Sequence, residues 1–455
     1  MLKRRDFLLT SAATLFARPS ISQAISTALT AGVAQVQLAP EGYDAAELWC
    51  FDGVSPGTEI RVRQGETVAR RFKNDLPEAS SVHWHGIRLK NAMDGVPGLT
   101  QDIVPAGGYH DYEFAAPDAG TFWYHSHNRS WEQLARGLYG PLIIDEPNPI
   151  DVDHDITLVF DDWRLTENGA LAGGYGNRHD NSHAGRFGNF ITVNGMIEER
   201  LQAKTGERLR LRLINTANAR IFELGWQGMS GWIVALDGMP LEVPERAERV
   251  TLAPAQRADI IVDIENSDDT PVIFMVQDEQ GYVLADIAVK KGTRAVRETV
   301  PVLPPNPVPS LTKAPTESVV TVLMEGGAMG GMQSAAHAGE DLSMRELVQK
   351  GQFWALNGVA GLTDTPLFAS DQNAPHRIQF INRTAFPHGM HLHGHHFREI
   401  LEDGTLGLWR DTLLVGPDET REVALIADNP GKWLLHCHML GHQAAGMKTW
   451  FEVDA

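Results

Sequence analysis

Cysteine is nearly absent from this chain. Its 455 residues include 2 cysteines, Cys50 and Cys437. Two thiols cannot build the disulfide framework that holds small secreted folds together. Cys50 lies in the apolar stretch ELWCFDG, and we interpret it as a small buried hydrophobe on a strand. Hydrophobic cores must therefore stabilise the chain, and its length predicts two or three domains.

Basic charge and long hydrophobic runs are also scarce. The 39 Lys and Arg residues are outnumbered by 58 Asp and Glu residues, which gives a formal net charge of −19. An acidic surface of this kind disfavours nucleic acid as a partner. No stretch is long and apolar enough to form a transmembrane helix, so we expect no stable membrane insertion.

Residues 1–24, MLKRRDFLLTSAATLFARPSISQA, have the composition of a targeting segment. Arg4 and Arg5 precede a short, mildly apolar run that ends in Ser-Gln-Ala. This pattern resembles a bacterial twin-arginine export signal. The resemblance implies recognition by the twin-arginine export machinery and a periplasmic location for the mature protein.

One pattern occurs three times along the rest of the chain. A turn signal stands in FDGVSPG, VNGMIEE and LNGVAGL, and each is followed by a polar-apolar alternation that ends in Asn74, Asn215 or Asn382. Alternation between turn residues predicts β-strands. Three such units predict an all-β chain of three Greek-key β-barrel domains. We place these domains at residues 34–147, 152–295 and 317–455, with a Pro-rich linker over 296–316.

The first and third copies carry four His-x-His pairs, and the second copy carries none at the matching positions. Residues i and i+2 of a strand point to the same face, so each pair can direct two imidazoles to one side. Imidazole suits copper, zinc, iron or nickel, and eight imidazoles are too many for one ion. We therefore expect a metal cluster between domains 1 and 3. The pairs are His83/His85, His125/His127, His391/His393 and His436/His438.

The stretch HCHMLGHQAAGM adds a second kind of site. Cys437 lies between two histidines of the cluster, so its side chain points to the opposite face of the strand. His442 follows closely, and His388 precedes the third His-x-His pair. One cysteine and two histidines, with Met447 as a weak axial ligand, match a blue-copper electron-transfer site.

The four motifs HWHG, HSH, HGMHLH and HCHMLGHQAAGM resemble those of the multicopper oxidase family, over nearly all of the chain after the export segment. The resemblance implies three cupredoxin-like domains and four copper ions: one type 1, one type 2 and two type 3. It implies His388, Cys437, His442 and Met447 as ligands of the type 1 copper, His83 and His391 of type 2, and His85, His125, His127, His393, His436 and His438 of type 3.

The reaction that this resemblance implies has two partners, O2 and a small-molecule or metal-ion reductant. Four one-electron oxidations would send electrons from Cys437 through His436 and His438, and O2 would become two waters. This reaction consumes protons, and we expect Asp94, in NAMDGVPG, to donate them; the alternative is an ordinary turn aspartate. Gly441 stands where many bacterial relatives carry an acid, which leaves a second proton route open.

The identity of the reductant is open between three readings. An axial Met implies a modest potential, which suits easily oxidised donors. The first reading is a laccase-like oxidase of phenols and aromatic amines. The second is a cuprous or ferrous oxidase, and the third is an exported copper-binding or scaffold protein. The complete ligand set argues against the third reading.

A methionine-rich segment favours the second reading. Soft thioethers bind Cu(I), and relatives that oxidise Cu(I) carry a Met-rich insert. The chain departs from those relatives at Thr384 and Phe386, which stand where they can offer Asp and Met. An incidental Gly-rich loop is the alternative. Likewise, His179 and His183, in GGYGNRHDNSHAGRFGN, could chelate metal or merely lie in a loop. The candidate Cu(I) ligands are Met324, Met329, Met332 and Met344.

Overall fold

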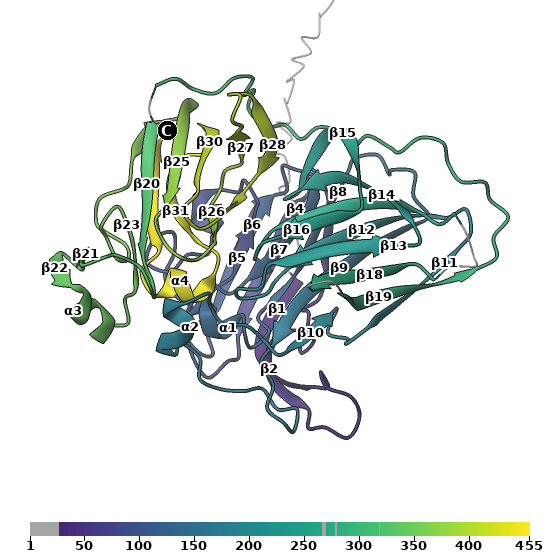
Figure 1. The fold of residues 1–455 in the computed structure, drawn as a ribbon, viewed down its shortest axis with the longest axis horizontal. Coiled ribbons are helices and arrows are strands. Elements are labelled where there is room, and N and C mark those ends of the chain that lie inside the picture. The colour runs from purple at the N-terminus through teal and green to yellow at the C-terminus, as the bar shows by residue number, and fades with distance from the viewer. Residues whose placement is uncertain (1–26, 266–269, 278–279, 318) are drawn as a thin grey trace, which may run out of the picture.

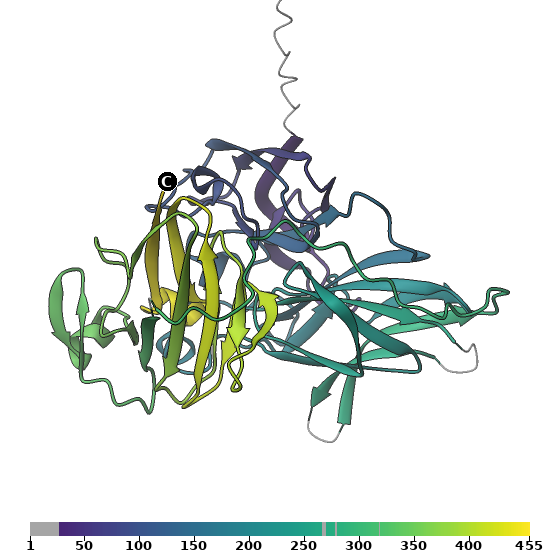
Figure 2. The same ribbon diagram turned by 90° about the horizontal axis from the view of Figure 1, so that it is seen from above.

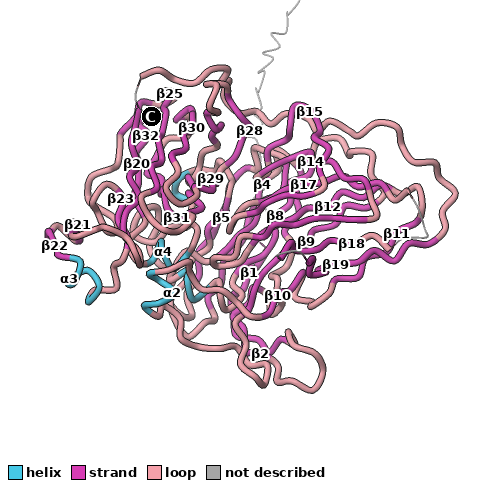
Figure 3. Tube along the Cα trace, in the orientation of Figure 1, coloured by secondary structure: helices cyan, strands magenta, loops and turns pink. Residues whose placement is uncertain are grey.

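The computed structural model describes residues 27–265, 270–277, 280–317 and 319–455 (Figure 1). Strands dominate these residues and the helices are short (Figure 3), which confirms the all-β prediction. None of the helices in the described ranges is long and apolar enough to cross a membrane. The predicted export segment, residues 1–24, lies outside the described residues.

Domain 1 consists of two four-stranded sheets, ordered β2-β1-β4-β6 and β3-β8-β7-β5. Each sheet contains one parallel pair, β1 with β4 and β3 with β8. The first strand starts ahead of the predicted domain boundary at residue 34. The elements are β1 (Thr27–Val36), β2 (Ala46–Phe51), β3 (Ile60–Arg63), β4 (Thr67–Asn74), β5 (His83–His85), the 3-10 helix η1 (Asn91–Met93), β6 (Tyr109–Ala115), β7 (Gly120–His125), α1 (Ser130–Gln133) and β8 (Tyr139–Asp145).

Domain 2 repeats this plan with larger sheets, ordered β10-β9-β12-β17-β14-β15 and β11-β19-β18-β13-β16. Its parallel pairs are β9 with β12 and β11 with β19. The elements are β9 (His154–Trp163), α2 (Arg178–Ser182), β10 (Phe190–Val193), β11 (Glu199–Lys204), β12 (Arg208–Asn215), β13 (Phe222–Gln227), β14 (Ser230–Leu236), β15 (Met239–Ala247), β16 (Arg249–Leu252), β17 (Arg257–Asp263), β18 (Val272–Gln277) and β19 (Gln280–Lys290).

Domain 3 has sheets ordered β23-β20-β25-β30-β27-β28 and β24-β32-β31-β26-β29. The hairpin β21–β22 and α3 project from it, at the left of Figure 1. The elements are β20 (Val319–Gly326), β21 (Ser334–His337), β22 (Glu340–Ser343), α3 (Met344–Gln349), β23 (Trp354–Leu356), β24 (Ala369–Asp371), β25 (Ala374–Asn382), β26 (His388–Leu392), β27 (Phe397–Ile400), β28 (Leu406–Arg410), β29 (Thr412–Val415), β30 (Thr420–Ala427), β31 (Gly431–Cys437), α4 (Leu440–Ala444) and β32 (Lys448–Asp454).

The repeated asparagines end the equivalent strands β4, β12 and β25. Asn74, Asn215 and Asn382 are each fully buried. In each case the side-chain NH2 donates to at least two backbone carbonyls, and the side-chain oxygen accepts the N–H two residues later. A buried amide must be satisfied at both ends, and this geometry turns the chain at the strand end. The repeat in the sequence thus has a structural cause.

All three domains meet at the buried guanidinium of Arg257, on β17. Its Nε donates to the Thr121 carbonyl of domain 1 at 3.1 Å, and its Nη2 donates to Asp411 of domain 3 at 2.7 Å. The helices α1, α2 and α4, one from each domain, lie together, and α4 contacts both of the others (Figure 1). The linker predicted at 296–316 has neither helix nor strand and passes along the outside of the domains (Figure 2).

Candidate metal centre

The eight predicted cluster histidines lie where a strand pair of domain 1 faces a strand pair of domain 3. β5 pairs with β7 so that His83 stands opposite His125, and β26 pairs with β31 so that His391 stands opposite His436. His85 lies at the end of β5. The remaining three follow strand ends, and they are His127, His393 and His438.

The rings from the two domains interleave. His83 stacks on His393 with ring centroids 4.0 Å apart, and His85 stacks on His391 at 3.8 Å. The Nε2 atoms of His393 and His436 are 3.1 Å apart. Ring nitrogens lie within 4.8 Å of one another in three groups, namely His83/His391/His393, His83/His85/His125 and His127/His393/His436. The ring of His438 lies 5.1 Å from that of His85, which brings the eighth histidine to the same place.

Hydrogen bonds fix the protonation of several rings. A backbone carbonyl can only accept, so an imidazole Nδ1 bonded to one must carry the hydrogen, and its Nε2 then keeps a free lone pair. Four Nδ1 atoms donate to backbone carbonyls in this way. They are those of His83 (to Asp94 at 2.8 Å), His125 (to Ser126 at 2.9 Å), His391 (to Asp411 at 2.9 Å) and His436 (to Cys437 at 2.9 Å).

The free ring nitrogens fit a bound cation. Buried nitrogens without a hydrogen-bond partner include Nε2 of His83, His125, His127 and His391 and both ring nitrogens of His85 and His438. Each buried nitrogen left without a partner lowers the stability of the fold by roughly 1–3 kcal/mol. Burial is the main cause that lowers the pKa of six cluster histidines well below the ordinary value, and repulsion from neighbouring imidazoles is the second. The six are His85, His125, His127, His393, His436 and His438. These six rings are therefore neutral at pH 7, the form that binds metal.

Asp94 touches histidines of both domains. Its carboxylate lies 3.0 Å from His393 Nδ1, and its backbone carbonyl accepts from His83 Nδ1. A tight turn holds it there: Gly95 has φ +83°, and a Cβ at that glycine would lie 1.8 Å from the Val82 carbonyl oxygen. The side chain is buried against the cluster. Its predicted role as a proton donor stays a prediction.

Asp411 is a cluster neighbour that the sequence motifs did not reveal. Its Oδ1 lies 3.4 Å from His85 Nε2 and 3.6 Å from His391 Nδ1. Burial alone would raise the pKa of the Asp411 carboxyl, but the Arg257 guanidinium, His85 and His391 together outweigh it, so that pKa lies well below the usual range. The segment LWRDTLLVG contains no motif, and only the pairing of β26 with β29 brings Asp411 to the histidines.

The second predicted site forms on the opposite face of β31. The Nδ1 atoms of His388 and His442 lie 3.0 Å apart, and they lie 3.6 and 3.7 Å from Cys437 Sγ. Both Nε2 atoms point away and donate, from His388 to Thr384 Oγ1 at 2.7 Å and from His442 to the His183 carbonyl at 2.6 Å. Nδ1 is therefore the free nitrogen of each ring, and both face the sulfur.

The protonation states at this second site also suit a cation. Burial lowers the pKa of His442 to about 4. Burial also lowers the pKa of His388, and the nearby His442 ring lowers it further. Burial raises the pKa of the Cys437 thiol to about 12. A thiolate here requires a cation beside it, so metal binding would release the thiol proton.

Two methionines lie near Cys437. Met447, the predicted axial ligand, is fully buried in the same core, and its carbonyl accepts the Cys437 N–H at 3.1 Å. Met439, which no sequence motif singles out, places its Sδ 3.8 Å from Cys437 Sγ and accepts the Gly389 N–H at 3.2 Å. The structure thus brings a second thioether to the sulfur of the site.

The four methionines proposed to bind Cu(I) do not share one exposed surface. Met324 is fully buried on β20 in the hydrophobic core, which corrects its place in the predicted set, because a core side chain cannot receive a cation from solvent. Met332 and Met344 pack against the small apolar cluster of the projecting hairpin. Only Met329 stands free, with 82% of its surface exposed.

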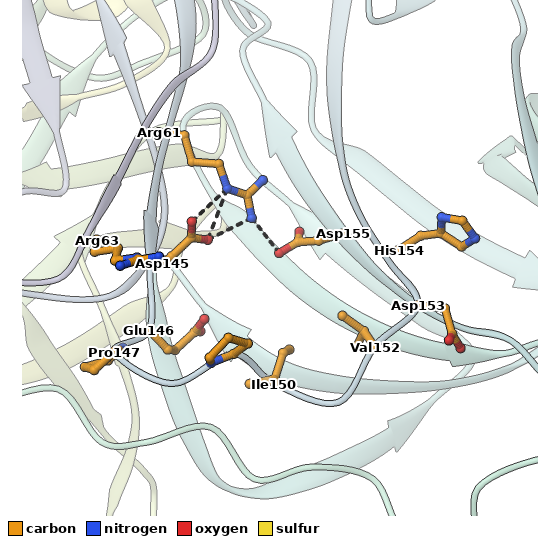
Figure 4. A pocket seen from close by; sticks show the side chains of 11 residues that line it. Arg61, Arg63, Asp145, Glu146, Pro147, Ile150, Val152, Asp153, His154 and Asp155 are labelled. Carbon is orange, nitrogen blue, oxygen red and sulfur yellow. Dashed lines mark hydrogen bonds and ion pairs between the residues drawn. The ribbon is translucent and has the colours of Figure 1, made fainter.

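A surface pocket between domains 1 and 2 lies apart from these sites (Figure 4). In it, Arg61 of β3 donates to Asp145 at 2.7 Å and to Asp155 at 2.8 Å. None of the predicted site residues lines it. Its charged side chains pair across β3, β8 and β9, so they join the two domains.

Comparisons with known proteins show the family to which the chain belongs. Three multicopper oxidase family models match residues 32–149, 154–291 and 337–455. Multicopper oxidase MmcO of Mycobacterium tuberculosis is 30% identical, with 95% of this chain and 88% of that protein covered.

Solved structures are similar over most of their length. Lac15 from a marine microbial metagenome is 46% identical, with 94% and 99% of the two chains covered and a TM-score of 0.76. A multicopper oxidase from Pseudomonas thermotolerans is 30% identical, with 94% and 99% covered and a TM-score of 0.82. These likenesses confirm the cupredoxin-like fold. The chain therefore belongs to the multicopper oxidase family, whose members are copper-dependent oxidoreductases.

Proposed function

We propose that the chain oxidises a reductant in one-electron steps at the Cys437 site and reduces O2 to two waters at the eight-histidine site. One observation carries the proposal: a single strand, β31, joins both sites, because Cys437 faces His388 and His442 while its neighbour His436 faces His393. Bound copper ions would supply the one-electron redox chemistry at both sites. We assign four ions, with the type 1, type 2 and type 3 ligands given above.

The residues themselves provide a short electron path. The Nδ1 of His436 donates to the Cys437 carbonyl at 2.9 Å, so a hydrogen bond adds to the covalent link between the two residues. Cys437, His436 and His438 are all buried, which keeps water from both ends of this path. Asp94, which belongs to domain 1, is the proposed proton donor because its carboxylate contacts the cluster histidine His393 of domain 3.

For the reductant, we propose laccase-like oxidation of phenols and aromatic amines. Proteins similar to this chain carry names of two kinds, such as Laccase-1 of Botryotinia fuckeliana and a copper resistance protein A homolog of Pseudomonas syringae pv. tomato. Oxidation of Cu(I) or Fe(II) is the second candidate, because His183, whose ring stacks on that of His179, accepts a hydrogen bond from His442 at its backbone carbonyl. A periplasmic location after twin-arginine export completes the proposal.

Oxygen consumption by the copper-loaded protein tests this function. A phenol, Cu(I) and Fe(II) are supplied in parallel, and the O2 consumed and any hydrogen peroxide formed are measured. We expect one O2 consumed for every four electrons, without peroxide, and a Cys437→Ser variant without activity. Peroxide as the main product, or full activity in the Cys437→Ser variant, would contradict the proposal.

A further inference from the structure

Domain 2, in which we predict no copper ligand, reaches the histidine cluster through one side chain. Arg257 of β17 donates to both oxygens of the Asp411 carboxylate, from Nη1 to Oδ1 at 3.0 Å and from Nη2 to Oδ2 at 2.7 Å. Asp411 Oδ1 in turn lies 3.4 Å from His85 Nε2 and 3.6 Å from His391 Nδ1. All four side chains are fully buried. Domain 2 thus contacts one histidine of each outer domain through a single carboxylate.

Further hydrogen bonds hold the Arg257 guanidinium in place. Its Nε donates to the Thr121 carbonyl at 3.1 Å, and its Nη1 also donates to the Ala255 carbonyl at 3.0 Å. The backbone N–H of Arg257 donates to Asp237 Oδ1 at 2.9 Å. Two parallel hydrogen bonds from a guanidinium fix the plane of a carboxylate as well as its distance. The orientation of the Asp411 carboxylate is therefore set from domain 2.

The oriented carboxylate acts on both histidines. An ionised carboxylate can only accept, so Asp411 favours the His85 tautomer that carries its hydrogen on Nε2. His85 Nδ1, which is buried and has no hydrogen-bond partner, then keeps the lone pair that binds metal. The Thr412 hydroxyl lies between the other two groups, 2.8 Å from Asp411 Oδ1 and 3.2 Å from His391 Nδ1. One carboxylate oxygen thus orients a ring from each outer domain.

Gly86, the glycine of the HWHG motif, shows how closely the ion pair packs on the strand of His85. Its φ is +84°, and a Cβ at this residue would lie 2.4 Å from Arg257 Nη2 and 2.6 Å from Asp411 Oδ2. A larger residue would have to displace the guanidinium and the carboxylate together. The ion pair therefore gives a physical reason for the glycine that follows His85 in the motif.

We propose that Arg257 is a positioning residue of the cluster, which holds Asp411 against His85 and His391 and so keeps the type 2 copper bound. The proposal rests on the oxidase function and the copper assignment given above. Without the guanidinium, the Asp411 carboxylate loses both hydrogen bonds from domain 2, and His391 loses a fixed partner at its outer nitrogen.

The type 2 copper should be the most sensitive to this loss. We assign it two histidines, His83 and His391, whereas the type 3 pair shares six. A change in the orientation of His391 therefore affects half of the protein ligands of the type 2 copper. The Cys437 site lies on the opposite face of β31 and should keep its copper.

Copper retention tests this role without relying on turnover. The copper-loaded protein is dialysed against increasing concentrations of a copper chelator, and the copper per chain, the electron paramagnetic resonance signal of the type 2 copper and the blue band are measured. Arg257→Gln removes the charge, and Arg257→Lys keeps the charge but cannot form the two parallel hydrogen bonds. The control, Arg210→Gln, removes an equally buried guanidinium that pairs with Asp259 and with Glu146 of domain 1 instead of Asp411.

We expect Arg257→Gln to lose the type 2 copper at a chelator concentration about 10- to 100-fold lower than the wild type requires, with the blue band retained. Arg257→Lys should lie between these two proteins, and it decides alone if Arg257→Gln does not fold. The control should retain copper as the wild type does.

Two results would overturn the positioning role. The first is equal retention of the type 2 copper in the wild type and the Arg257 variants, and the second is an equal loss in Arg210→Gln, which would indicate a general loosening of the domains. Absence of O2 consumption by the wild type with every reductant would instead overturn the oxidase function, and copper retention would still decide the role of Arg257.

Discussion

Each histidine of the Cys437 site depends on a hydrogen bond at its far nitrogen. Thr384 Oγ1 accepts from His388 Nε2 while its own hydroxyl hydrogen goes to Asn382 Oδ1 at 2.8 Å. This arrangement leaves His388 Nδ1 free to bind metal. We predict that Thr384→Val weakens copper binding at this site by about 10- to 100-fold, as outer partners of metal ligands typically do. Copper competition monitored by the blue absorption measures the effect.

The matched control is Thr384→Ser, which keeps the hydroxyl. It should bind copper as the wild type does. If the valine and serine variants bind copper equally well, the hydrogen bond does not orient His388.

Asp94 provides a second prediction at this scale. Its carboxylate contacts His393, whereas its backbone carbonyl holds His83. Asp94→Asn keeps the backbone contact and the shape of the side chain but removes an acidic proton donor. We predict an approximately 10²-fold lower rate of O2 reduction, within the range for a positioned acid, with the blue band unchanged. Rapid mixing of the reduced variant with O2 measures this step, and an unaltered rate would remove Asp94 from proton delivery.

The sequence could predict the histidines because strand geometry makes their side-chain directions regular. His83/His85 and His436/His438 alternate with residues that face the other way, and the repeat pairs the motifs of domains 1 and 3. It could not predict Asp411 or the His183 carbonyl, because both reach the sites through contacts between segments distant in the chain. It also misplaced Met324, whose burial depends on the packing of β20.

At the scale of elements, α2 packs against α4, and Asn181 of α2 lies against Gly441 of α4. We predict that Gly441→Glu displaces α2, because the added side chain must enter the space of Asn181. Overpacking of this kind costs about 1–3 kcal/mol. Hydrogen exchange of residues 178–183 should therefore become faster in the variant.

Gly441→Ala is the control for this change. Its Cβ meets the Asn181 side-chain oxygen at 3.0 Å, which a small rotation of that side chain relieves. Exchange in α2 should then stay close to that of the wild type. Equal exchange in the glutamate variant and the wild type would show that α2 does not need the glycine.

At the scale of the whole molecule, Arg257 links the three domains. It is fully buried and bonds Thr121 of domain 1 and Asp411 of domain 3. Removing it leaves the Asp411 carboxylate buried without its partner, so we predict that Arg257→Leu lowers the free energy of unfolding by about 3–5 kcal/mol. In contrast, Arg71→Leu breaks an exposed, solvent-screened pair with Asp111 and should lower the free energy of unfolding far less. Urea unfolding of both variants compares them.

An ion pair between the start of domain 2 and the linker predicts that the stability of the fold depends on pH. The Arg297 guanidinium lowers the pKa of Asp153 from its usual 3.8 to about 2. A carboxyl whose pKa is lower in the folded protein than in the unfolded chain stabilises the fold at pH values above the unfolded-chain pKa. This contribution is lost as the pH falls from about 4 to about 2. Asp153→Asn should therefore lose less stability than the wild type over this interval. Thermal unfolding at pH 5 and near pH 2 measures the difference, and identical losses would contradict the assignment.

The central claim is that one strand, β31, joins a one-copper site at Cys437 to a three-copper site at the eight histidines. The most direct measurement is the copper content per chain together with the visible spectrum, for the wild type and for Cys437→Ser. We predict four copper ions and an intense blue band in the wild type, and three copper ions without the blue band in Cys437→Ser. A wild type with one copper ion, or an intense blue band that survives in Cys437→Ser, would contradict this account.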